Sequence, residues 1–338
     1  MNGYPIYYQH SYNIHNKIFS NICSNSIRIL INKNEEIRNH IVNFHLSEKS
    51  SEIPNYVKHL IKAFNLYFDR TILDFNKVVM LEERILFSEY LTEEDKKQIY
   101  SILNDIKKYA FNICGSHKLI PQIVLSKDYR RFFMFPYHAK KTQYLYSILE
   151  NIISFKPDNT YDFYSFDING AVPRFLIYTI NKELFEMSID KDIYEFIFNV
   201  IINRLSVKVK FNRNQFKISL LSFIHDKFNV DKIYNYIKNN LLDKTDGLNE
   251  TYLKEKLIKI IEGELFKSKI KIMDINESIY NEIINNTYFS INEFILKDII
   301  IDFDIIPIYI NFDGGLIASK PNNIDELKKK YKFINLEK

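Results

Sequence analysis

The sequence predicts a mainly helical α+β protein with a small antiparallel sheet, and three observations support this fold class. Only 7 glycines and 8 prolines occur in 338 residues, so long helices meet few interruptions. Strand-like runs are confined to residues 161–166 and 305–319. Strands and helices do not alternate regularly, and no Gly-rich phosphate loop is present, which argues against a doubly wound nucleotide-binding fold.

The first 150 residues have the apolar spacing of amphipathic helices. We expect helices over residues 35–46, 56–73, about 77–91 and 92–110. The last of these begins with a threonine, Thr92, that can cap the helix. Three acidic residues follow it and favour the positive end of the helix dipole.

The second half of the chain combines helices with a strand before them and a hairpin after them. The aromatic-rich run 161–166 predicts a strand that ends at Asp167. Helical patterning then resumes over about 172–240 and 250–267. The segments expected after it are a strand over 305–309, a turn over 311–315, a returning strand over 315–319 and, beyond Pro321, a helix over about 324–330.

The composition indicates a packed protein rather than a disordered one. Hydrophobic residues make up 46% of the chain and aromatic residues 15%, which is ample for a core. The net charge of +4 is a mild basic excess that suits a phosphate-rich partner. The two cysteines, Cys23 and Cys114, are too few for a disulfide framework or a metal cluster, so a reducing compartment is expected.

No stretch of the sequence has the roughly 18 apolar residues in a row that a membrane span requires. Residues 1–17 lack the basic region and apolar run of a signal peptide. We therefore expect a soluble, cytoplasmic protein without a membrane partner. The abundance of Ile, Lys, Asn, Phe and Tyr fits an AT-rich genome and favours a bacterial or phage origin.

Two aspartates stand where a predicted strand ends and a turn begins. They are Asp167 in SFDINGAVPRFL and Asp313 in YINFDGGLI. Carboxylates at strand ends can converge on one side of a sheet and coordinate Mg²⁺, which prefers oxygen ligands. Two such ions about 3.5–4 Å apart can activate a 3′-hydroxyl and stabilise a leaving pyrophosphate. Taken singly, each aspartate is more simply interpreted as a turn or cap residue.

Two groups of cations are candidates for phosphate binding. Arg213 and Lys217 stand four residues apart in a predicted helix, so both side chains can reach the phosphates of one nucleotide. A solvated basic face is the alternative interpretation. Arg130 and Arg131 belong to a run over 127–141 in which cations and aromatics are interleaved. This run suits either a nucleic-acid backbone or a solvated helix end.

Taken in their order, four segments resemble motifs of family A DNA polymerases. DINGAVPRFLIY, with Asp167 and Arg174, resembles the first palm motif, and DKDIYEFIF at 190–198 resembles a short helix start that follows it. The cation pair four residues apart matches the fingers-helix motif. PIYINFDGGLIASKPNNIDELKKKY, which contains Asp313, resembles the carboxyl-terminal palm hairpin. The resemblance covers about 155–338.

The resemblance implies a right-hand polymerase with a small antiparallel palm sheet and no proofreading exonuclease domain. Residues 1–154 would form an N-terminal helical region that includes a thumb equivalent. Residues 155–189 and 297–338 would form the palm, and 190–296 the fingers with inserted helices. The implied activity is template-directed nucleotidyl transfer by a DNA-directed DNA polymerase. The implied partners are a nucleic-acid primer-template, nucleoside triphosphates and a processivity or replication protein.

The same resemblance implies roles for individual residues. Asp167 and Asp313 would hold two Mg²⁺ ions, which Mn²⁺ could replace. Lys217 would contact the triphosphate and protonate pyrophosphate, and Arg213 would grip the γ-phosphate. The nucleotide-binding set is completed by Leu221 and His225, and the nucleic-acid-binding set comprises Arg130, Arg131 and Arg174.

Departures from the family pattern leave alternatives open. Val172 replaces a glutamate that limits ribonucleotide use in the family, which allows an RNA or primer-synthesising polymerase with relaxed sugar selection. Leu221, Phe312 and Gly314 also depart from the motifs, which allows a catalytically degenerate, polymerase-like nucleic-acid-binding protein. The two aspartates and Lys217 fit a family B pattern as well, and an unrelated helical scaffold is a further interpretation.

Overall fold

The computed structural model describes residues 71–109, 144–156, 160–242 and 249–338, together with three strands and some single positions nearer the N-terminus. The strands are 26–30, 122–126 and 132–135, and the single positions are 56, 59, 62, 63, 66, 67 and 70. The predicted helix 35–46 and the predicted nucleic-acid-binding residues Arg130 and Arg131 lie outside the described residues.

The chain divides into two compact units. Unit 1 comprises Met1–Phe166, Asn292–Leu327 and Leu336–Lys338, and unit 2 comprises Asp167–Ile291 and Lys328–Asn335. The chain therefore passes from one unit to the other several times. The division into N-terminal region, palm and fingers that the sequence implies is a different partition, and it stays a prediction.

Unit 1 is built on a seven-stranded sheet in which neighbouring strands pair antiparallel from β1 through β8. In the order of the sheet, the strands are β1 (Ser26–Leu30), β3 (Gln122–Ser126), β4 (Phe132–Phe135), β7 (Ile306–Asn311), β8 (Gly314–Ser319), β6 (Asp162–Ile168) and β9 (Ile334–Glu337). β6 and β9 each run from one unit into the other. Segments far apart in the sequence thus build one sheet.

The β7–β8 hairpin lies in the interior of this sheet and confirms the predicted hairpin. Its isoleucines are buried, as expected for central strands rich in β-branched residues. Pro307 lies at a β-bulge, where its missing N–H is tolerated. Gly315 is required because a Cβ at this position would overlap the carbonyl oxygen of Tyr309. Asn311 pairs with Gly314, which leaves a turn of two residues.

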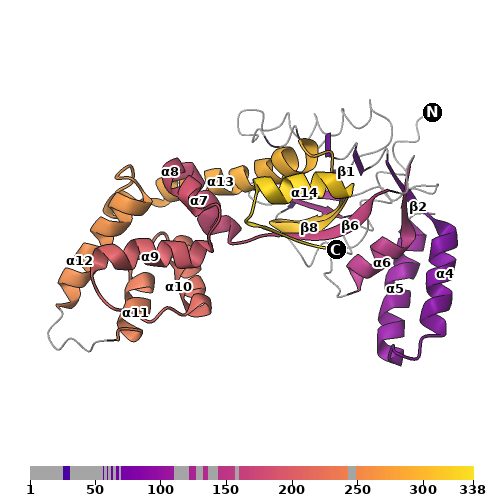
Figure 1. Ribbon diagram of the computed structural model, residues 1–338, viewed down its shortest axis with the longest axis horizontal. Helices are drawn as coiled ribbons and strands as arrows, with labels where there is room; N and C mark the ends of the chain where they lie inside the picture. Colours follow the sequence, from indigo (N-terminus) through magenta and orange to yellow (C-terminus); the bar gives the residue numbers. More distant parts are fainter. Residues whose placement is uncertain are drawn as a thin grey trace. The chain divides into compact units, whose positions relative to one another are not determined.

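Three helices of unit 1 accompany a short second sheet of β2 (Thr71–Leu73) and β5 (Ile153–Phe155). They are α4 (Phe75–Leu86), α5 (Glu93–Tyr109) and α6 (Leu145–Ile152) (Figure 1). The Thr92 cap of α5 is confirmed, since the Asp95 N–H donates to the Thr92 hydroxyl at 3.2 Å. In return, Asp95 accepts the Thr92 N–H at 3.1 Å, which completes a reciprocal capping arrangement.

The N-terminal half contains more strand than the sequence predicts. The predicted helix 56–73 is helical at its described positions from 59 to 70, but Thr71–Leu73 forms strand β2. These residues pair with β5, which lies about 80 residues further along the chain, and local periodicity carries no sign of such a partner. The strands β3 and β4 lie beyond the helices expected over 35–110, where no strand was predicted.

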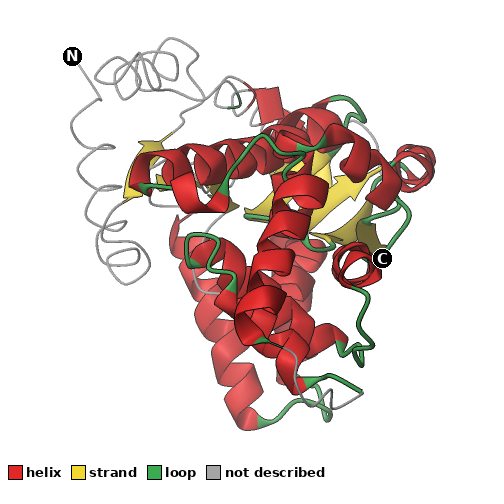
Figure 2. Cartoon of the chain, turned by 90° about the vertical axis from the view of Figure 1, so that its left-hand side faces the viewer, coloured by secondary structure: helices red, strands yellow, loops and turns green. Residues whose placement is uncertain are grey.

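Unit 2 consists mainly of helices, and its core is aromatic. Figure 2 shows the helices of the chain in red and its strands in yellow. The helices of unit 2 are α7 (Ala171–Ile180), α8 (Lys182–Ser188), α9 (Ile193–Leu205), α10 (Arg213–His225), α11 (Asp231–Asn239), α12 (Glu250–Ile260), the π-helical turn η2 (Ile261–Leu265), the 3-10 turn η3 (Ile272–Asp274) and most of α13 (Glu277–Glu293). In the core, the rings of Phe198, Phe211, Phe216 and Tyr236 pack at centroid distances of 4.8–6.2 Å.

After α13 the chain continues in unit 1 as the π-helical segment η4 (Phe294–Ile301), and helix α14 (Pro321–Lys330) follows β8. Pro321 occupies the first position of α14, where its missing N–H does no harm. The fold class is therefore confirmed as α+β and mainly helical with antiparallel sheets. Among the helices that the structure describes, none has the length and apolar composition needed to cross a bilayer.

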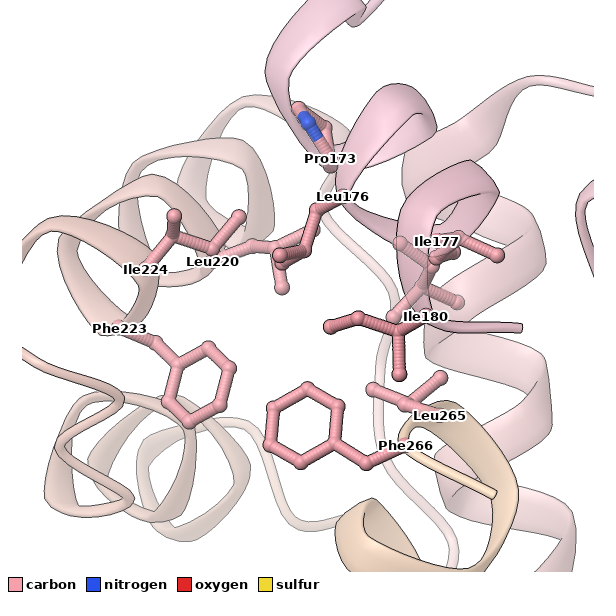
Figure 3. A pocket seen from close by; sticks show the side chains of 10 residues that line it. Pro173, Leu176, Ile177, Ile180, Leu220, Phe223, Ile224, Leu265 and Phe266 are labelled. Carbon is pink, nitrogen blue, oxygen red and sulfur yellow. The ribbon is translucent and has the colours of Figure 1, made fainter. Parts of the chain in front are cut away.

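Helices α7 and α10 pack directly against each other in unit 2. Between them lies a void of about 10 Å³ with an entirely apolar lining, to which α7 contributes Leu176 and Ile180 and α10 contributes Leu220 and Phe223 (Figure 3). A cavity of this size without polar groups stays dry. The apolar contact fixes the position of α10 relative to α7.

Candidate functional site

The four residues predicted to bind the nucleotide lie on one helix, α10, at intervals of four. α10 buries Phe216, Leu220, Phe223 and Ile224 in the core of unit 2. Helical geometry therefore turns the other face outward. Arg213, Lys217 and His225 are exposed and Leu221 is half-buried. The predicted set thus forms a stripe that faces solvent, which we call the α10 stripe.

Asp192 holds Arg213, the first residue of the α10 stripe. Both Nε and Nη2 of Arg213 donate to Oδ2 of Asp192, at 2.8 and 2.7 Å. The other oxygen of Asp192 caps helix α9, because it accepts the backbone N–H groups of Tyr194 and Glu195 at 3.1 and 3.0 Å. One carboxylate therefore joins the beginnings of two helices.

The surroundings of Asp192 favour its charged form. Partial burial acts to raise its pKa, but the N–H of Glu195 and the guanidinium of Arg213 outweigh burial and hold the pKa of Asp192 below its ordinary value. The carboxylate is consequently ionised at neutral pH. It offsets the cost of placing a cation, Arg213, at the positive end of the α10 dipole.

The ring of Tyr194 lies beneath the two cations of the α10 stripe. The guanidinium carbon of Arg213 is 5.1 Å from the ring centroid, and the ammonium nitrogen of Lys217 is 5.7 Å from it. Tyr194 is buried, so the ring is a fixed surface under both charges. Cation–π attraction at these distances holds both side chains near each other.

Lys217 has no carboxylate partner among the residues that the structure describes. Arg213 likewise keeps Nη1 without a hydrogen-bond partner within the described part of the chain. With one carboxylate for two cations and a helix N-terminus beside them, the stripe retains positive charge. Such an arrangement can bind an anion.

The segment that follows Asp167 reaches the α10 stripe through Asn169. Nη2 of Arg213 donates to Oδ1 of Asn169 at 3.4 Å. The next residue, Gly170, has a φ of 63° and precedes α7. A Cβ at this position would overlap Cγ2 of Ile193, so the first turn of α9 packs directly on the Gly170 backbone. This close approach brings Asp192, the residue before Ile193, near Asn169, so that Arg213 can contact both.

Arg174 is predicted from the sequence to bind nucleic acid, but the structure gives it a different role. It is fully buried, and its guanidinium donates to the carbonyl oxygens of Asn169, Ser188 and Lys191 at 3.3, 2.8 and 3.0 Å. Burial lowers the pKa of Arg174 to about 10, so the side chain remains charged at neutral pH. Direct contact with a nucleic-acid backbone is incompatible with this burial. Arg174 instead ties together the backbone segments around the stripe.

The two predicted metal ligands belong to different units. Asp167 is the sixth residue of β6 and is exposed, and it is the first residue of unit 2. Asp313 lies in unit 1, in the two-residue turn between β7 and β8. In the sheet order, β6 is the neighbour of β8. Within unit 2, the segment that follows Asp167 reaches Arg213 through Asn169, whereas Asp313 belongs to unit 1.

The turn that carries Asp313 has an unusual backbone. Its first residue, Phe312, has a φ of 62°, in the left-handed region that suits glycine and strains a bulky side chain. The sequence gives no sign of this conformation, since nothing in the hairpin pattern distinguishes Phe312 from an ordinary turn residue.

Carboxylate oxygens are the donors that Mg²⁺ prefers, so Asp167 and Asp313 have suitable ligand chemistry. Within the described ranges, no three His, Cys, Asp or Glu side chains gather into a ready-made metal cluster. The magnesium prediction therefore rests on the sequence.

Sequence reasoning did not assign site roles to Asn169, Asp192 and Tyr194. A local signal exists for Asp192, because an aspartate three residues before Glu195 at the start of an apolar helix is typical of an N-cap. Its second partner, Arg213, is 21 residues away, and no local pattern predicts that contact.

Comparison with known proteins gives no identification. No protein-family model matches the chain, and no curated protein matches its sequence.

Proposed function

We propose that this chain is a template-directed nucleotidyltransferase, most simply a DNA polymerase, and that the α10 stripe binds the triphosphate of the incoming nucleotide. One observation carries the proposal. Arg213 and Lys217 stand one helical turn apart on an exposed face, above the same tyrosine ring, and only Arg213 has a carboxylate partner, Asp192, among the described residues.

The chemistry of the stripe suits a polyphosphate better than a single charge. Arg213 has Nη1 still available, and its guanidinium can pair with two phosphate oxygens. Lys217, one turn further along, offers a mobile ammonium that can bind an adjacent phosphate and supply a proton to the leaving pyrophosphate. The N-terminus of α10 adds positive potential at the same end.

Asp167 and Asp313 are proposed as ligands of two Mg²⁺ ions, with Mn²⁺ as a substitute. When bound, such ions supply charge neutralisation and activation of a hydroxyl nucleophile. The support is the oxygen chemistry of both side chains together with the order of the sequence motifs. The exposed position of Asp167 and its closeness in sequence to Asn169 are consistent with this role.

The choice between deoxyribose and ribose stays open in this proposal. Val172, at the position where family A polymerases have a selective glutamate, is buried in α7. A buried valine offers neither a carboxylate nor an exposed surface to a sugar. This observation favours the variant of the proposal in which sugar selection is relaxed and RNA or primers are made.

A second candidate is a catalytically degenerate, polymerase-like protein that binds nucleic acid. The ion pair between Arg213 and Asp192 favours it. An arginine that makes two hydrogen bonds to a carboxylate often stabilises the packing of two helices and binds no ligand. The two candidates differ in one respect that can be measured, which is nucleotide incorporation.

Binding of a fluorescent nucleoside triphosphate tests the stripe. Lys217→Ala and Arg213→Ala should each weaken binding about 10-fold or more, since each removes a charge-assisted contact. Lys232→Ala is the matched control, because it removes a half-buried lysine of the next helix that pairs with Asp226 at 3.2 Å. Equal affinities of all three variants and the wild type would place the triphosphate elsewhere.

Primer extension with separate dNTP and rNTP pools tests the reaction. Asp167→Ala and Asp313→Ala should each abolish Mg²⁺-dependent incorporation, and Asp231→Ala, which removes an aspartate paired with Lys254, should not. Activity that persists in both Asp167→Ala and Asp313→Ala would show that these aspartates are not the ligands of the catalytic metal ions. Nucleic-acid binding without incorporation of any nucleotide, with Mg²⁺ or Mn²⁺, would favour the degenerate candidate.

A further inference from the structure

The connection between α4 and α5 exposes three large apolar side chains at the end of a helical hairpin. Leu86, Phe87 and Tyr90 are 58%, 78% and 98% exposed. Helix α4 has 12 residues and rises 1.5 Å per residue, so these side chains lie about 18 Å along the helix from strand β2. Figure 1 shows this connection at the free end of α4 and α5. We call residues 86–95 the hairpin tip.

Two further exposed apolar side chains lie on α4. Val79 is two helical turns before Leu86, and Met80 is two turns before Phe87, so each pair shares a face. Val79 and Met80 are 53% and 52% exposed. Single exposed apolar residues are ordinary, but three at one hairpin tip, with two more on the helix that leads to it, mark an interaction surface.

Acidic residues outnumber basic ones around this surface, where the flanking cations are Arg84, Lys96 and Lys97. The hairpin tip contains Glu89, Glu93, Glu94 and Asp95 and no lysine or arginine. Glu93 pairs with Lys96 at 3.2 Å, and Asp95 accepts from Thr92. Glu89 and Glu94 are exposed and have no ion-pair partner among the described residues. An acidic rim repels nucleic acid and anionic lipid, and it favours a basic partner.

The tip is held in place before any partner binds. The Phe87 N–H donates to the Glu83 carbonyl at 3.1 Å, and the Tyr90 N–H donates to the Ser88 hydroxyl at 3.3 Å. On the other side, the Lys96 ammonium donates to the Leu86 carbonyl at 3.5 Å. A surface that is already ordered loses little entropy on binding.

We propose that the hairpin tip, with the exposed face of α4, docks onto a partner protein through an amphipathic element that is apolar at its centre and rimmed by lysine and arginine. The five apolar side chains offer on the order of 600 Å² to such a partner, close to one side of a small specific interface. This surface is separate from the α10 stripe, so the proposal does not depend on nucleotide transfer.

Two synthetic helical peptides of about 18 residues serve as probes. Both have the same leucine face; one carries Lys and Arg on its flanks and the other carries Glu. Fluorescence anisotropy with the full-length protein should show that the basic peptide binds at least 10-fold more tightly than the acidic one. Raising the salt concentration should weaken the binding, because the rim charges are exposed.

Three variants separate the tip from the rest of the surface. The double variants Phe87→Ser/Tyr90→Ser and Glu89→Lys/Glu94→Lys should each weaken binding of the basic peptide at least 10-fold. Tyr252→Ser/Met273→Ser removes two comparably exposed residues of unit 2, which are 60% and 83% exposed, and should change it less than 2-fold. Thermal unfolding should be nearly the same for all of them, since every substituted residue is on the surface.

Any of four results would overturn the proposal. They are no binding of the basic peptide, equal binding of both peptides, binding that the tip variants leave unchanged, and competition at the tip by duplex DNA or by phosphatidylserine vesicles. Sedimentation velocity supplies a further result. Self-association that Phe87→Ser/Tyr90→Ser removes would assign the surface to a second copy of the chain instead.

Discussion

Arg213 donates two of its nitrogens to a single oxygen of Asp192, at 2.8 and 2.7 Å, while the other oxygen of Asp192 caps α9. This relationship sets the geometry of the α10 stripe, because it places the first cation of α10 beside the start of α9. It also allows the two duties of one carboxylate, capping and ion pairing, to be separated by substitution.

Asp192→Asn and Asp192→Ala should differ in stability. Asparagine can still cap α9, so Asp192→Asn loses only the charge of the ion pair. Alanine loses the cap as well, which costs about 1 kcal/mol more. Urea denaturation of both variants measures this difference. Equal free energies of unfolding would mean that the cap contributes nothing.

The ion pair should also give a pH dependence. Because the folded-state pKa of Asp192 is lowered, the stability that it contributes is complete above the ordinary aspartate pKa of about 3.9 and is lost as the pH falls through the folded-state value. The free-energy difference between wild type and Asp192→Asn should therefore be constant from pH 7 to about pH 5 and shrink below pH 4. A difference that grows in acid would contradict the assignment.

Gly170→Ala should destabilise unit 2 and weaken nucleotide binding together. The new Cβ meets Ile193, and the residue must also adopt a φ of 63°, which costs about 1–2 kcal/mol for a residue with a side chain. Gly263→Ala is the matched control, because no atom lies within 4 Å of its added Cβ and its φ is not in the left-handed region. Chemical denaturation should show Gly263→Ala to be neutral or slightly stabilised.

Arg174→Met should be among the most destabilising single substitutions in unit 2. It leaves the carbonyls of Asn169, Ser188 and Lys191 without their donors in a buried place, and we expect a loss of about 3–5 kcal/mol. Arg174→Lys keeps the charge but lacks the planar guanidinium that reaches all three carbonyls, so the loss of unfolding free energy should be smaller than for Arg174→Met. A loss below about 1 kcal/mol for Arg174→Met would show that these hydrogen bonds matter little.

Local signals in the sequence were sufficient for part of the fold. The cap at Thr92, the hairpin with its turn at Phe312 and Asp313, and the helix after Pro321 were predicted because capping groups, β-branched runs and proline act within a few residues. The strand β2 was missed because its partner β5 is remote in sequence. Arg174 was misjudged because nothing local tells a buried arginine from an exposed one.

The candidate site likewise contains residues that local sequence patterns predict and residues that they do not. The i, i+4 spacing of Arg213 and Lys217 predicted a shared helical face, and the structure places both on the exposed side of α10. The contributions of Asp192, Tyr194 and Asn169 depend on the packing of α7, α9 and α10. Packing between helices is set by side chains spread over the whole of unit 2, so no local pattern reveals it.

Unit 2 includes Lys328–Asn335, a segment separated from the rest of the unit by β7, β8 and most of α14. Within it, the guanidinium carbon of Arg174 lies 4.6 Å from the centroid of the Phe333 ring. The backbone carbonyl of Phe333 accepts the Asn169 N–H at 2.9 Å. On the ribosome, helices α7 to α12 therefore emerge long before the residue that covers the buried arginine. The Arg174 guanidinium is therefore covered by the Phe333 ring only after residues 328–335 have been synthesised.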